Sequence, residues 1–512
     1  MLQHNTEQMS VLPSLQVTGQ GLFSRPDWAG KQQDGTREYF IRASRLSLLH
    51  GIEHGEVYRN GQNSWSPTGW TGLHEPPIRI RSSSRRLTAD DPTWDDPVRH
   101  HSSWLIAVSS HGHDAHGHTL LVGCLQGDTP RLHADADLIA GWTETGTQAT
   151  WVILTGRDKD VFSRYSQLLA KLHTPRAGKI KRVWSSWYSL YEDVSQADIQ
   201  AIAPQLPRYG FDTLQIDDGW ELRVGDWTPN SKFPLHMSDL AAQIRDQGMS
   251  AGIWIAPFIV LPEAQAMQTN RQMLLRDGDA ELLTAGSNWG SRYFTYDFSR
   301  ADARQWLADL IGTVVHDWGF DMLKLDFLNA GAIPGKRSEA VDREFIYRDA
   351  LQVIRQAAGE DAFLLGSGAL IFPSLGILDA VRIGPDVAPM WDNYATTDMS
   401  DALAKNALRN SVNRLWMKGL IGLDPDIVYF RHQRNLLNDT QMQLLRDCTT
   451  LCDVRGISDP PSWLSPSELA AVRSYLLYDP RIRQLGRYRY LLDDREVDFA
   501  AALDQQHSLY AL

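Results

Sequence analysis

The sequence predicts a multidomain chain of the α/β plus β class, built around a (β/α)8 barrel, also called a TIM barrel. An N-terminal β-sandwich is expected before the barrel and a short C-terminal β segment after it. Three observations support this. The 512 residues suggest two to four domains at about 150 residues each. The character of the chain changes near residue 178. Strand and helix patterns then alternate over most of the remaining chain. The expected domains are 1–177, 178–478 and 479–512.

The first domain consists of short apolar stretches separated by turn-forming residues. The clearest stretches are 38–49, 104–110, 119–126 and 149–156, which are rich in Val, Ile, Leu, Tyr and Thr. Gly, Asn and Pro lie between them, and long helical patterns are scarce. This pattern is typical of an all-β sandwich.

The second domain alternates strand and helix patterns. The candidate strands are 181–188, 213–219, 250–258, 321–327, 361–368, 380–386, 417–424 and, more weakly, 454–459. Amphipathic helical patterns lie between most of them, as a (β/α)8 barrel requires. A doubly wound open sheet is the alternative. The tail, from residue 487 onward, suggests a few more strands that pack on the barrel.

Composition excludes several classes of partner. The chain has 50 Lys and Arg against 62 Asp and Glu, a formal charge of −12, which argues against nucleic acid or an anionic membrane as partner.

Three cysteines form no disulfide or zinc pattern, which favours a reducing compartment. No secretory signal and no apolar run of about 20 residues is visible, so we expect a cytoplasmic protein. The 18 Trp suit either sugar binding or an ordinary core.

The strand at 321–327 carries the first candidate catalytic group. Side chains alternate along a strand, so Lys324 and Asp326 share one face. An ammonium beside a carboxylate lowers the pKa of the acid and keeps it ionised, as a nucleophile requires. A structural ion pair is the alternative.

The segment 380–386 carries the second candidate group. Arg382 can bind a ligand or a carboxylate, and Asp386 follows Gly384 and Pro385 where the chain turns over the barrel mouth. A second carboxylate nearby raises the pKa of a loop carboxyl and makes it an acid. A helix cap is the alternative role. Asp326 and Asp386 together form the carboxylate pair of glycoside hydrolysis.

Asp217 and Asp218 end a third candidate strand. Two acceptor groups at this point suit adjacent sugar hydroxyls, whereas the alternative metal pair lacks a matching His or Glu cluster.

The His-rich tract 111–118 is interpreted as a solvated loop. The segment 330–338 lacks the spacing and the Ser or Thr of a phosphate loop, and 366–376 lacks the glycine spacing of a dinucleotide site.

Taken in order, these motifs resemble the bacterial α-galactosidases of glycoside hydrolase family 36. The segments that carry the resemblance are WSSWY, QIDDGWE, GDW, GIWIAPF, KLDFLNAGAIPG, RIGPDVAP and LDPD. It is strong over about 180–430 and looser in the preceding domain, where NSWS (63–66) is the clearest piece.

The resemblance implies a retaining enzyme that works through a covalent galactosyl intermediate without a metal or cofactor. Asp326 then corresponds to the nucleophile and Asp386 to the acid/base. The implied sugar-binding residues are Asp217, Asp218, Lys324, Arg382, Trp187, Trp254 and, from the β domain, Trp65. Ser367 stands where related proteins often carry Cys, and it retains a hydrogen-bonding hydroxyl.

The expected partner is a small α-galactoside of the melibiose or raffinose type, and no oligomeric state is predicted. A galactosyl transferase of the raffinose- or stachyose-synthase kind would share the whole catalytic set. An α-N-acetylgalactosaminidase would need room near Ser367 and Arg382. A non-catalytic sugar-binding protein is disfavoured because both carboxylates are present.

Overall fold

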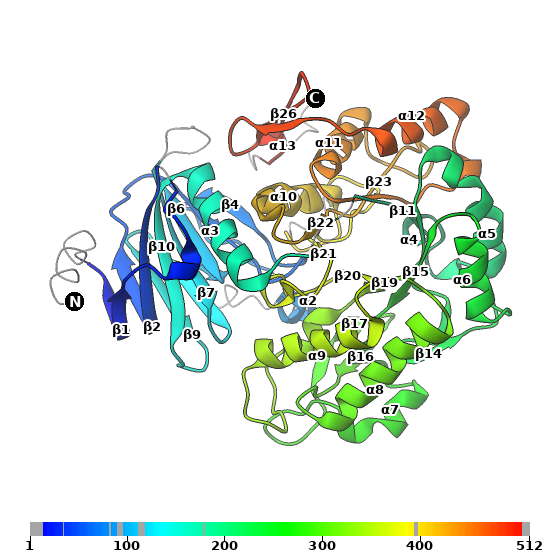
Figure 1. Cartoon of the computed structure of the whole chain (residues 1–512), viewed down its shortest axis with the longest axis horizontal. Helices are drawn as coiled ribbons and strands as arrows, with labels where there is room; N and C mark the ends of the chain where they lie inside the picture. The colour runs from blue at the N-terminus through cyan, green and yellow to red at the C-terminus, as the bar shows by residue number, and fades with distance from the viewer. Residues whose placement is uncertain are drawn as a thin grey trace.

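The computed structural model describes residues 14–33, 35–80, 83–89, 96–110, 118–176, 178, 180–393 and 398–503. An antiparallel sheet occupies the N-terminal part of the chain, and a curved parallel sheet with surrounding helices occupies the middle (Figure 1). A small C-terminal sheet lies above the junction of these two parts (Figure 1). The predicted divisions at 177/178 and 478/479 stay predictions.

The N-terminal sheet is antiparallel throughout, as expected from its short apolar stretches. Its path is β4-β3-β6-β7-β10-β2-β9-β8-β5, and β1 pairs with β2, so its strands form one connected sheet. The strands are β1 (Gln16–Phe23), β2 (Arg37–Leu49), β3 (Glu56–Arg59), β4 (Gly69–Gly72), β5 (His100–Ser103), β6 (Leu105–Ser109), β7 (His118–Gln126), β8 (Pro130–Ala134), β9 (Leu138–Thr143) and β10 (Ala149–Arg157).

A long helix, α3 (Asp158–His173), covers this sheet. Its buried apolar residues Val161, Phe162, Tyr165, Leu168 and Leu169 recur at helical spacing and form one face. The Tyr165 hydroxyl donates to the backbone carbonyl of Cys124 in β7 at 2.5 Å, which anchors that face to the sheet.

The central sheet is parallel, and each of the eight predicted segments contains one of its strands. The strands are β11 (Lys181–Ser185), β12 (Thr213–Ile216), β15 (Ser250–Ile255), β19 (Met322–Leu325), β20 (Phe363–Gly366), β21 (Ala380–Arg382), β22 (Gly422–Asp424), β23 (Ile427–Val428) and β24 (Val454–Ile457). From β11 to β22 each strand pairs with the next one along the chain, which excludes the doubly wound order.

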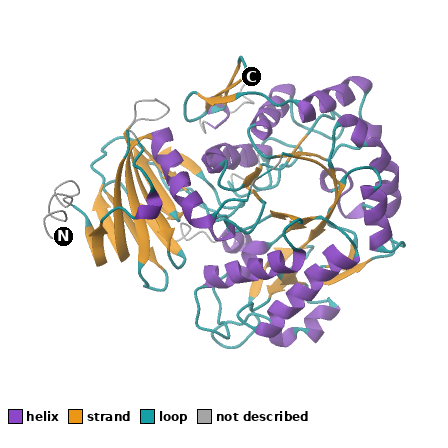
Figure 2. Ribbon diagram, viewed as in Figure 1, coloured by secondary structure: helices purple, strands orange, loops and turns teal. Residues whose placement is uncertain are grey.

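The two ends of this sheet come together. β22 and β23 are the terminal strands of the path, yet only Pro425 and Asp426 separate them in sequence. The first strand, β11, pairs with the last, β24, with Val183 opposite Gly456. The strands therefore curve into a ring with helices outside it (Figure 2).

Most helices of this region were indicated by the sequence pattern. The helices from this region onward are α4 (Trp187–Leu190), α5 (Gln196–Ile202), α6 (Met237–Arg245), α7 (Gln265–Thr269), α8 (Ala301–Gly312), α9 (Arg343–Ala358), α10 (Ala404–Arg414), α11 (Asp439–Thr450), α12 (Pro466–Leu477) and α13 (Ala500–Leu503). Asp342 caps α9 by accepting from two backbone N–H groups, and Asn438 with Gln441 forms a capping box on α11. By contrast, α10 was not predicted from the sequence, and it buries Asn, Arg and Ser together with its apolar residues.

Small hairpins interrupt the connections between strand and helix. β13 (Glu221–Arg223) pairs with β14 (Asp226–Pro229), and β16 (Ile259–Val260), β18 (Ser291–Thr295) and β17 (Thr284–Asn288) form a separate sheet. The C-terminal sheet is antiparallel and consists of β25 (Ile482–Gln484), β26 (Arg489–Leu492) and β27 (Arg495–Asp498); the last two lie in the tail, for which the sequence predicts strands.

Three further sequence expectations concern membrane-spanning helices, the cysteines and the His-rich tract. In the described portion of the chain, no helix is both long enough and apolar enough to cross a bilayer. The three cysteines, Cys124, Cys448 and Cys452, are buried and unpaired. Residues 111–117 of the His-rich tract lie outside the described residues.

Candidate active site

A cavity of about 300 Å³ lies at the carboxyl ends of the parallel strands. Parallel strands bring their carboxyl ends to one edge, so groups far apart in sequence meet there. The lining residues are Trp65, Arg85, Thr88, Trp187, Asp217, Asp218, Trp254, Ser287, Asn288, Trp289, Tyr293, Lys324, Asp326, Phe327, Asp386 and Ala402.

Asp326 is held in one orientation at the end of β19. Its Oδ2 accepts from the ring N–H of Trp254 at 3.0 Å, and its Oδ1 accepts from the backbone N–H of Phe327 at 2.7 Å. Phe327 has a φ of +53°, a left-handed conformation that ends the strand and turns its backbone toward the carboxylate. Both carboxylate oxygens are therefore fixed by donors while the group faces the cavity.

Lys324 faces the same cavity, but its ion-pair partner differs from the prediction. Its Nζ lies 2.8 Å from Oδ2 of Asp217, rather than pairing directly with Asp326. Burial is the largest effect on the pKa of Lys324 and lowers it, but the carboxylates of Asp217, Asp326 and Asp386 together outweigh burial, so the net pKa is raised. Gln215 Nε2 also donates to Asp217 Oδ2, at 2.5 Å. This buried network fixes Asp217 at the cavity floor.

Asp218 belongs to a second carboxyl pair. Its Oδ2 accepts from the ring N–H of Trp289 at 2.9 Å. Burial, followed by the neighbouring Glu221 carboxyl, raises the pKa of Asp218 to about 9. The pKa of Glu221 is also raised, first by burial. Ionising both Asp218 and Glu221 would place two negative charges side by side in a buried site, so the two carboxyls share a proton. Asp218 can therefore donate a hydrogen bond as well as accept one.

Asp386 reaches the cavity from the segment after β21. Its Oδ1 lies 3.3 Å from Nη1 of Arg382, and that guanidinium also pairs with Asp424 and Asp426, each at 3.0 Å. Burial is the largest effect on the pKa of Asp386 and raises it. The positive charges of Arg382 and Lys324 lower this pKa, the Asp326 carboxylate raises it, and the net pKa is raised. Asp386 therefore tends to keep its proton, whereas Asp326 is held in place by hydrogen-bond donors. A carboxyl that keeps its proton suits acid catalysis.

The structure brings together eight of the ten residues that the sequence singled out. Those that line the cavity are Trp65, Trp187, Asp217, Asp218, Trp254, Lys324, Asp326 and Asp386. Arg382 and Ser367 are buried outside the lining. Arg382 contacts Asp386 from below, and Ser367 continues the strand pairing by donating its backbone N–H to Leu325.

Trp65 reaches the cavity from the segment between β3 and β4, as the resemblance implies. Its backbone N–H donates to Asn63 Oδ1 at 2.9 Å, which shapes the loop. Arg414, fully buried in α10, then holds this loop through the carbonyls of Asn63 at 2.7 Å and Gly61 at 3.0 Å. Its other guanidinium nitrogen donates to Ile383, next to Arg382, at 2.6 Å. One side chain thus connects the Trp65 loop to the strand that leads to Asp386.

Sequence reasoning missed the roof of the cavity. Arg85 and Thr88 come from α2 (Ser83–Ala89), while Trp289 and Tyr293 come from the β17–β18 hairpin and its turn. The guanidinium of Arg85 lies 4.3 Å from the ring centre of Trp65. Gly290, at φ +68°, is a turn signal between two alternating stretches and could have located the hairpin. No comparable signal marks α2. Among the described residues, no group of three or more His, Cys, Asp or Glu could hold a metal ion.

Comparisons with known proteins agree with this geometry. The sequence profile of the melibiase family matches residues 160–356. An α-galactosidase from Thermus thermophilus, solved with p-nitrophenyl α-D-galactopyranoside, has a TM-score of 0.86 and 34% identity over 96% of this chain and 97% of that one. The same enzyme has also been solved with stachyose, with a TM-score of 0.81, 34% identity, and coverage of 90% and 96%.

More distant relatives share only part of the chain. Alpha-galactosidase 2 of Pediococcus pentosaceus is 26% identical over 198 residues, which is 37% of this chain but only 25% of that relative. The family 36 α-galactosidase AgaA of Geobacillus stearothermophilus shares the fold, with a TM-score of 0.59 and 14% identity over 87% of this chain and 65% of that one. Because the Thermus enzyme aligns over nearly its whole length, the chain belongs to the melibiase family, the α-galactosidases of glycoside hydrolase family 36.

Proposed function

We propose that the protein is a retaining exo-α-galactosidase that releases terminal α-linked galactose from small oligosaccharides of the melibiose and raffinose type. The main support is one observation: Asp326 and Asp386 line the same small cavity together with a set of sugar-binding side chains. The Thermus relative, solved with an aryl galactoside and with stachyose, supports the same class of substrate.

In this proposal the ring of parallel strands is a closed (β/α)8 barrel, and galactose occupies the cavity at its mouth. Asp217 and Lys324 bind hydroxyls at the floor, and Asp218 binds another with Trp289 behind it. The rings of Trp187, Trp254 and Trp65 supply flat apolar walls for the C–H faces of the sugar. Arg382 acts indirectly, by orienting Asp386 and tuning its pKa.

The first chemical step breaks the glycosidic bond. A carboxylate oxygen of Asp326 attacks the anomeric carbon, and Asp386 gives its proton to the departing oxygen, which leaves as an alcohol. The transition state carries positive charge on the sugar ring, and the surrounding carboxylates stabilise it. The product is a galactosyl ester of Asp326, while Asp386 is left ionised.

The second step restores the enzyme. Asp386 takes a proton from water, and the resulting hydroxide equivalent attacks the anomeric carbon and displaces Asp326. Two inversions return the original α configuration. This mechanism requires the two carboxyl groups to be about 5–5.5 Å apart, closer than in an inverting enzyme.

A substrate panel with stereochemical analysis tests the proposal. Nitrophenyl α-galactoside, α-glucoside and α-N-acetylgalactosaminide are compared, and NMR follows the first anomer released. We expect the α-galactoside to be preferred and α-galactose to appear first. Initial β-galactose would contradict retention, and preference for either other glycoside would contradict the assigned sugar. Galactosyl oligosaccharides that outweigh free galactose would instead identify a transferase.

A further inference from the structure

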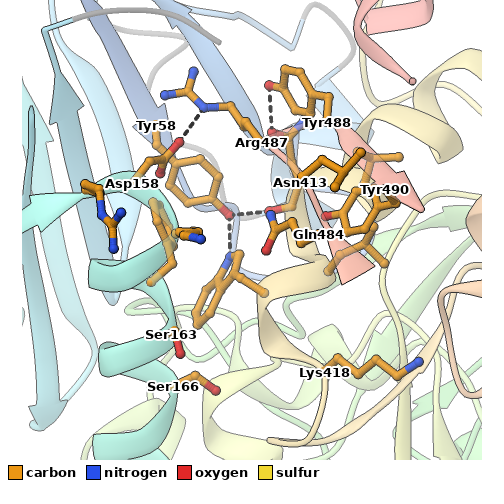
Figure 3. A pocket seen from close by; sticks show the side chains of 18 of the residues that line it. Tyr58, Asp158, Ser163, Ser166, Asn413, Lys418, Gln484, Arg487, Tyr488 and Tyr490 are labelled. Carbon is orange, nitrogen blue, oxygen red and sulfur yellow. Dashed lines mark hydrogen bonds and ion pairs between the residues drawn. The ribbon is translucent and has the colours of Figure 1, made fainter. Parts of the chain in front are cut away.

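A second and larger cavity lies away from the candidate active site. It has a volume of about 500 Å³, within the usual range of small-molecule sites. We call it the junction cavity because β3, β4 and α3, the end of α10 with the residues after it, and the C-terminal sheet all line it (Figure 3). None of its lining residues belongs to the candidate active site.

One wall of the junction cavity is a continuous group of aromatic rings. Tyr58 lies 5.4 Å from Trp70 and 4.9 Å from Phe162, measured between ring centres, and Phe162 lies 5.5 Å from Trp416. Tyr58 and Phe162 are buried, and the Arg487 guanidinium lies 3.6 Å from the ring centre of Trp70. The partly buried ring of Trp416 is therefore the member of this group that a ligand would meet first. Ring faces carry partial negative charge and attract the polarised C–H bonds of a sugar.

The hydrogen bonds around these rings make the wall rigid. The ring N–H of Trp416 donates to the Tyr58 hydroxyl at 3.0 Å, and that hydroxyl donates to the Asn413 carbonyl at 2.9 Å. The Tyr488 hydroxyl donates to Asn413 Oδ1 at 3.1 Å from the opposite side. The bonds from the Tyr58 and Tyr488 hydroxyls therefore meet at Asn413 (Figure 3). The cavity is therefore formed without a ligand, which lowers the entropic cost of binding.

Neutral hydrogen-bonding groups lie beside the aromatic wall. Ser163, Ser166 and Gln167 line the cavity from α3, the helix that also carries Phe162, and Figure 3 shows the two serines projecting from that helix. Gln484 joins them from the C-terminal sheet. Hydroxyls and amides both donate and accept, as the hydroxyls of a sugar do.

The described lining contains four cationic side chains, Arg157, Lys159, Lys418 and Arg487, and one carboxylate, Asp158. Arg487 pairs with Glu56 and with Asp158, and Arg157 pairs with Asp160. The Lys418 ammonium donates to the Leu451 carbonyl at 2.7 Å. Asp158 is the only carboxylate in the described lining, and its partner is Arg487, so the cavity holds no acid–nucleophile pair. The lack of such a pair in the described lining favours binding over cleavage.

We propose that the junction cavity is a second saccharide site, which binds a neutral sugar against the aromatic wall and the neutral polar groups of α3 without cleaving it. An aromatic surface combined with neutral hydroxyl and amide groups matches a pyranose better than a lipid tail. The proposal rests on this lining alone and is independent of the hydrolysis proposed above.

Saturation-transfer NMR on the full chain tests the site with stachyose as the probe. Excess 1-deoxygalactonojirimycin, a ligand with which the family 36 relative AgaA has been solved, is added to occupy the active site, and loss of nitrophenyl α-galactoside hydrolysis verifies this. We expect residual saturation transfer to stachyose under these conditions. Ser166→Trp fills the junction cavity and should reduce this residual signal by about tenfold, and Gln484→Ala should weaken it.

Ser474→Trp is the matched control because Ser474 is an exposed serine on α12, outside the cavity lining. It should leave the residual signal unchanged. Hydrolysis of nitrophenyl α-galactoside by Ser166→Trp should equal that of the wild type, which shows that the fold is intact. Absence of a residual signal in the wild type, or an equal signal in Ser166→Trp and Ser474→Trp, would overturn the proposal. Failure to hydrolyse any galactoside would instead refute the proposed function and leave this binding test valid.

Discussion

Asp326 and Asp386 have different surroundings, and these differences match different roles. Asp326 receives one N–H on each oxygen, from Trp254 and Phe327. Asp386 has a raised pKa and a single guanidinium contact, from Arg382. Asp326, which accepts hydrogen bonds on both oxygens, suits nucleophilic attack, and Asp386, which keeps its proton, suits acid catalysis.

Replacement of each carboxylate should separate these roles. Asp326→Ala should abolish turnover of every galactoside, because no covalent intermediate can form. Asp386→Ala should lose about 10²–10⁴-fold on raffinose but much less on aryl galactosides with good leaving groups, which need little protonation. Steady-state rates across a series of leaving groups provide the measurement. Equal losses on good and poor leaving groups would count against Asp386 as the acid.

The pH dependence of activity should report the environment of Asp386. The acid works only when protonated, so kcat/KM should fall as pH rises through its raised pKa. Arg85 lowers that pKa electrostatically, so Arg85→Gln should move the alkaline limb to higher pH. Arg208→Gln, at an exposed site outside the cavity lining, is the control and should leave the limb unchanged. A shift of the Arg85→Gln limb toward lower pH would refute this account.

At the scale of elements, the cavity depends on α10 as well as on the strands. The Arg414 guanidinium holds the carbonyls of Gly61 and Asn63 on one side and of Ile383 on the other. It therefore positions the Trp65 loop and the approach to Asp386 without touching the cavity.

Arg414→Lys keeps the charge but loses the planar fork that makes several bonds at once. We expect kcat/KM to fall about 5–30-fold on raffinose and less on a nitrophenyl galactoside, because misplacing the acid affects poor leaving groups most. The matched control is Arg409→Lys, whose hydrogen bonds stay within residues 399–410. If both variants lose activity equally on both substrates, Arg414 has only a structural role.

The strands were predictable from sequence, and the loops that complete the cavity were not. Each parallel strand is a short apolar run followed by polar residues, so β19 and the segment 380–386 revealed Asp326, Lys324 and Asp386 directly. The Lys324–Asp217 pair joins neighbouring parts of a folded sheet, and alternation within one strand cannot reveal it. Arg85 lies on a short helix between β4 and β5, far in sequence from the parallel strands, and only tertiary packing brings it to the cavity.

At the scale of the whole molecule, Arg487 ties the C-terminal sheet to the N-terminal part. Its guanidinium pairs with Glu56 and Asp158 and lies 3.6 Å from the ring centre of Trp70. The side chain is 6% exposed, so its removal leaves two carboxylates facing a poorly solvated junction.

Arg487→Gln should lower the free energy of unfolding by about 2–4 kcal/mol, since it breaks a largely buried charge network. Urea denaturation followed by tryptophan fluorescence provides the measurement, and a lower slope would indicate that the parts unfold separately. Arg489→Gln is the matched control, because Arg489 lies two residues away and its pairs with Glu496 and Asp498 are exposed. If the control loses as much stability, the junction is not the cause.

The pairing of β11 with β24 has a consequence for biosynthesis. The first strand of the ring waits for a partner made more than 250 residues later, so the ribosome must translate past Ile457 before the ring can form. At about 5–20 residues per second, this interval is tens of seconds. During that time the nascent sheet has an open edge able to pair with other chains, which makes translation speed and chaperone capture determinants of yield.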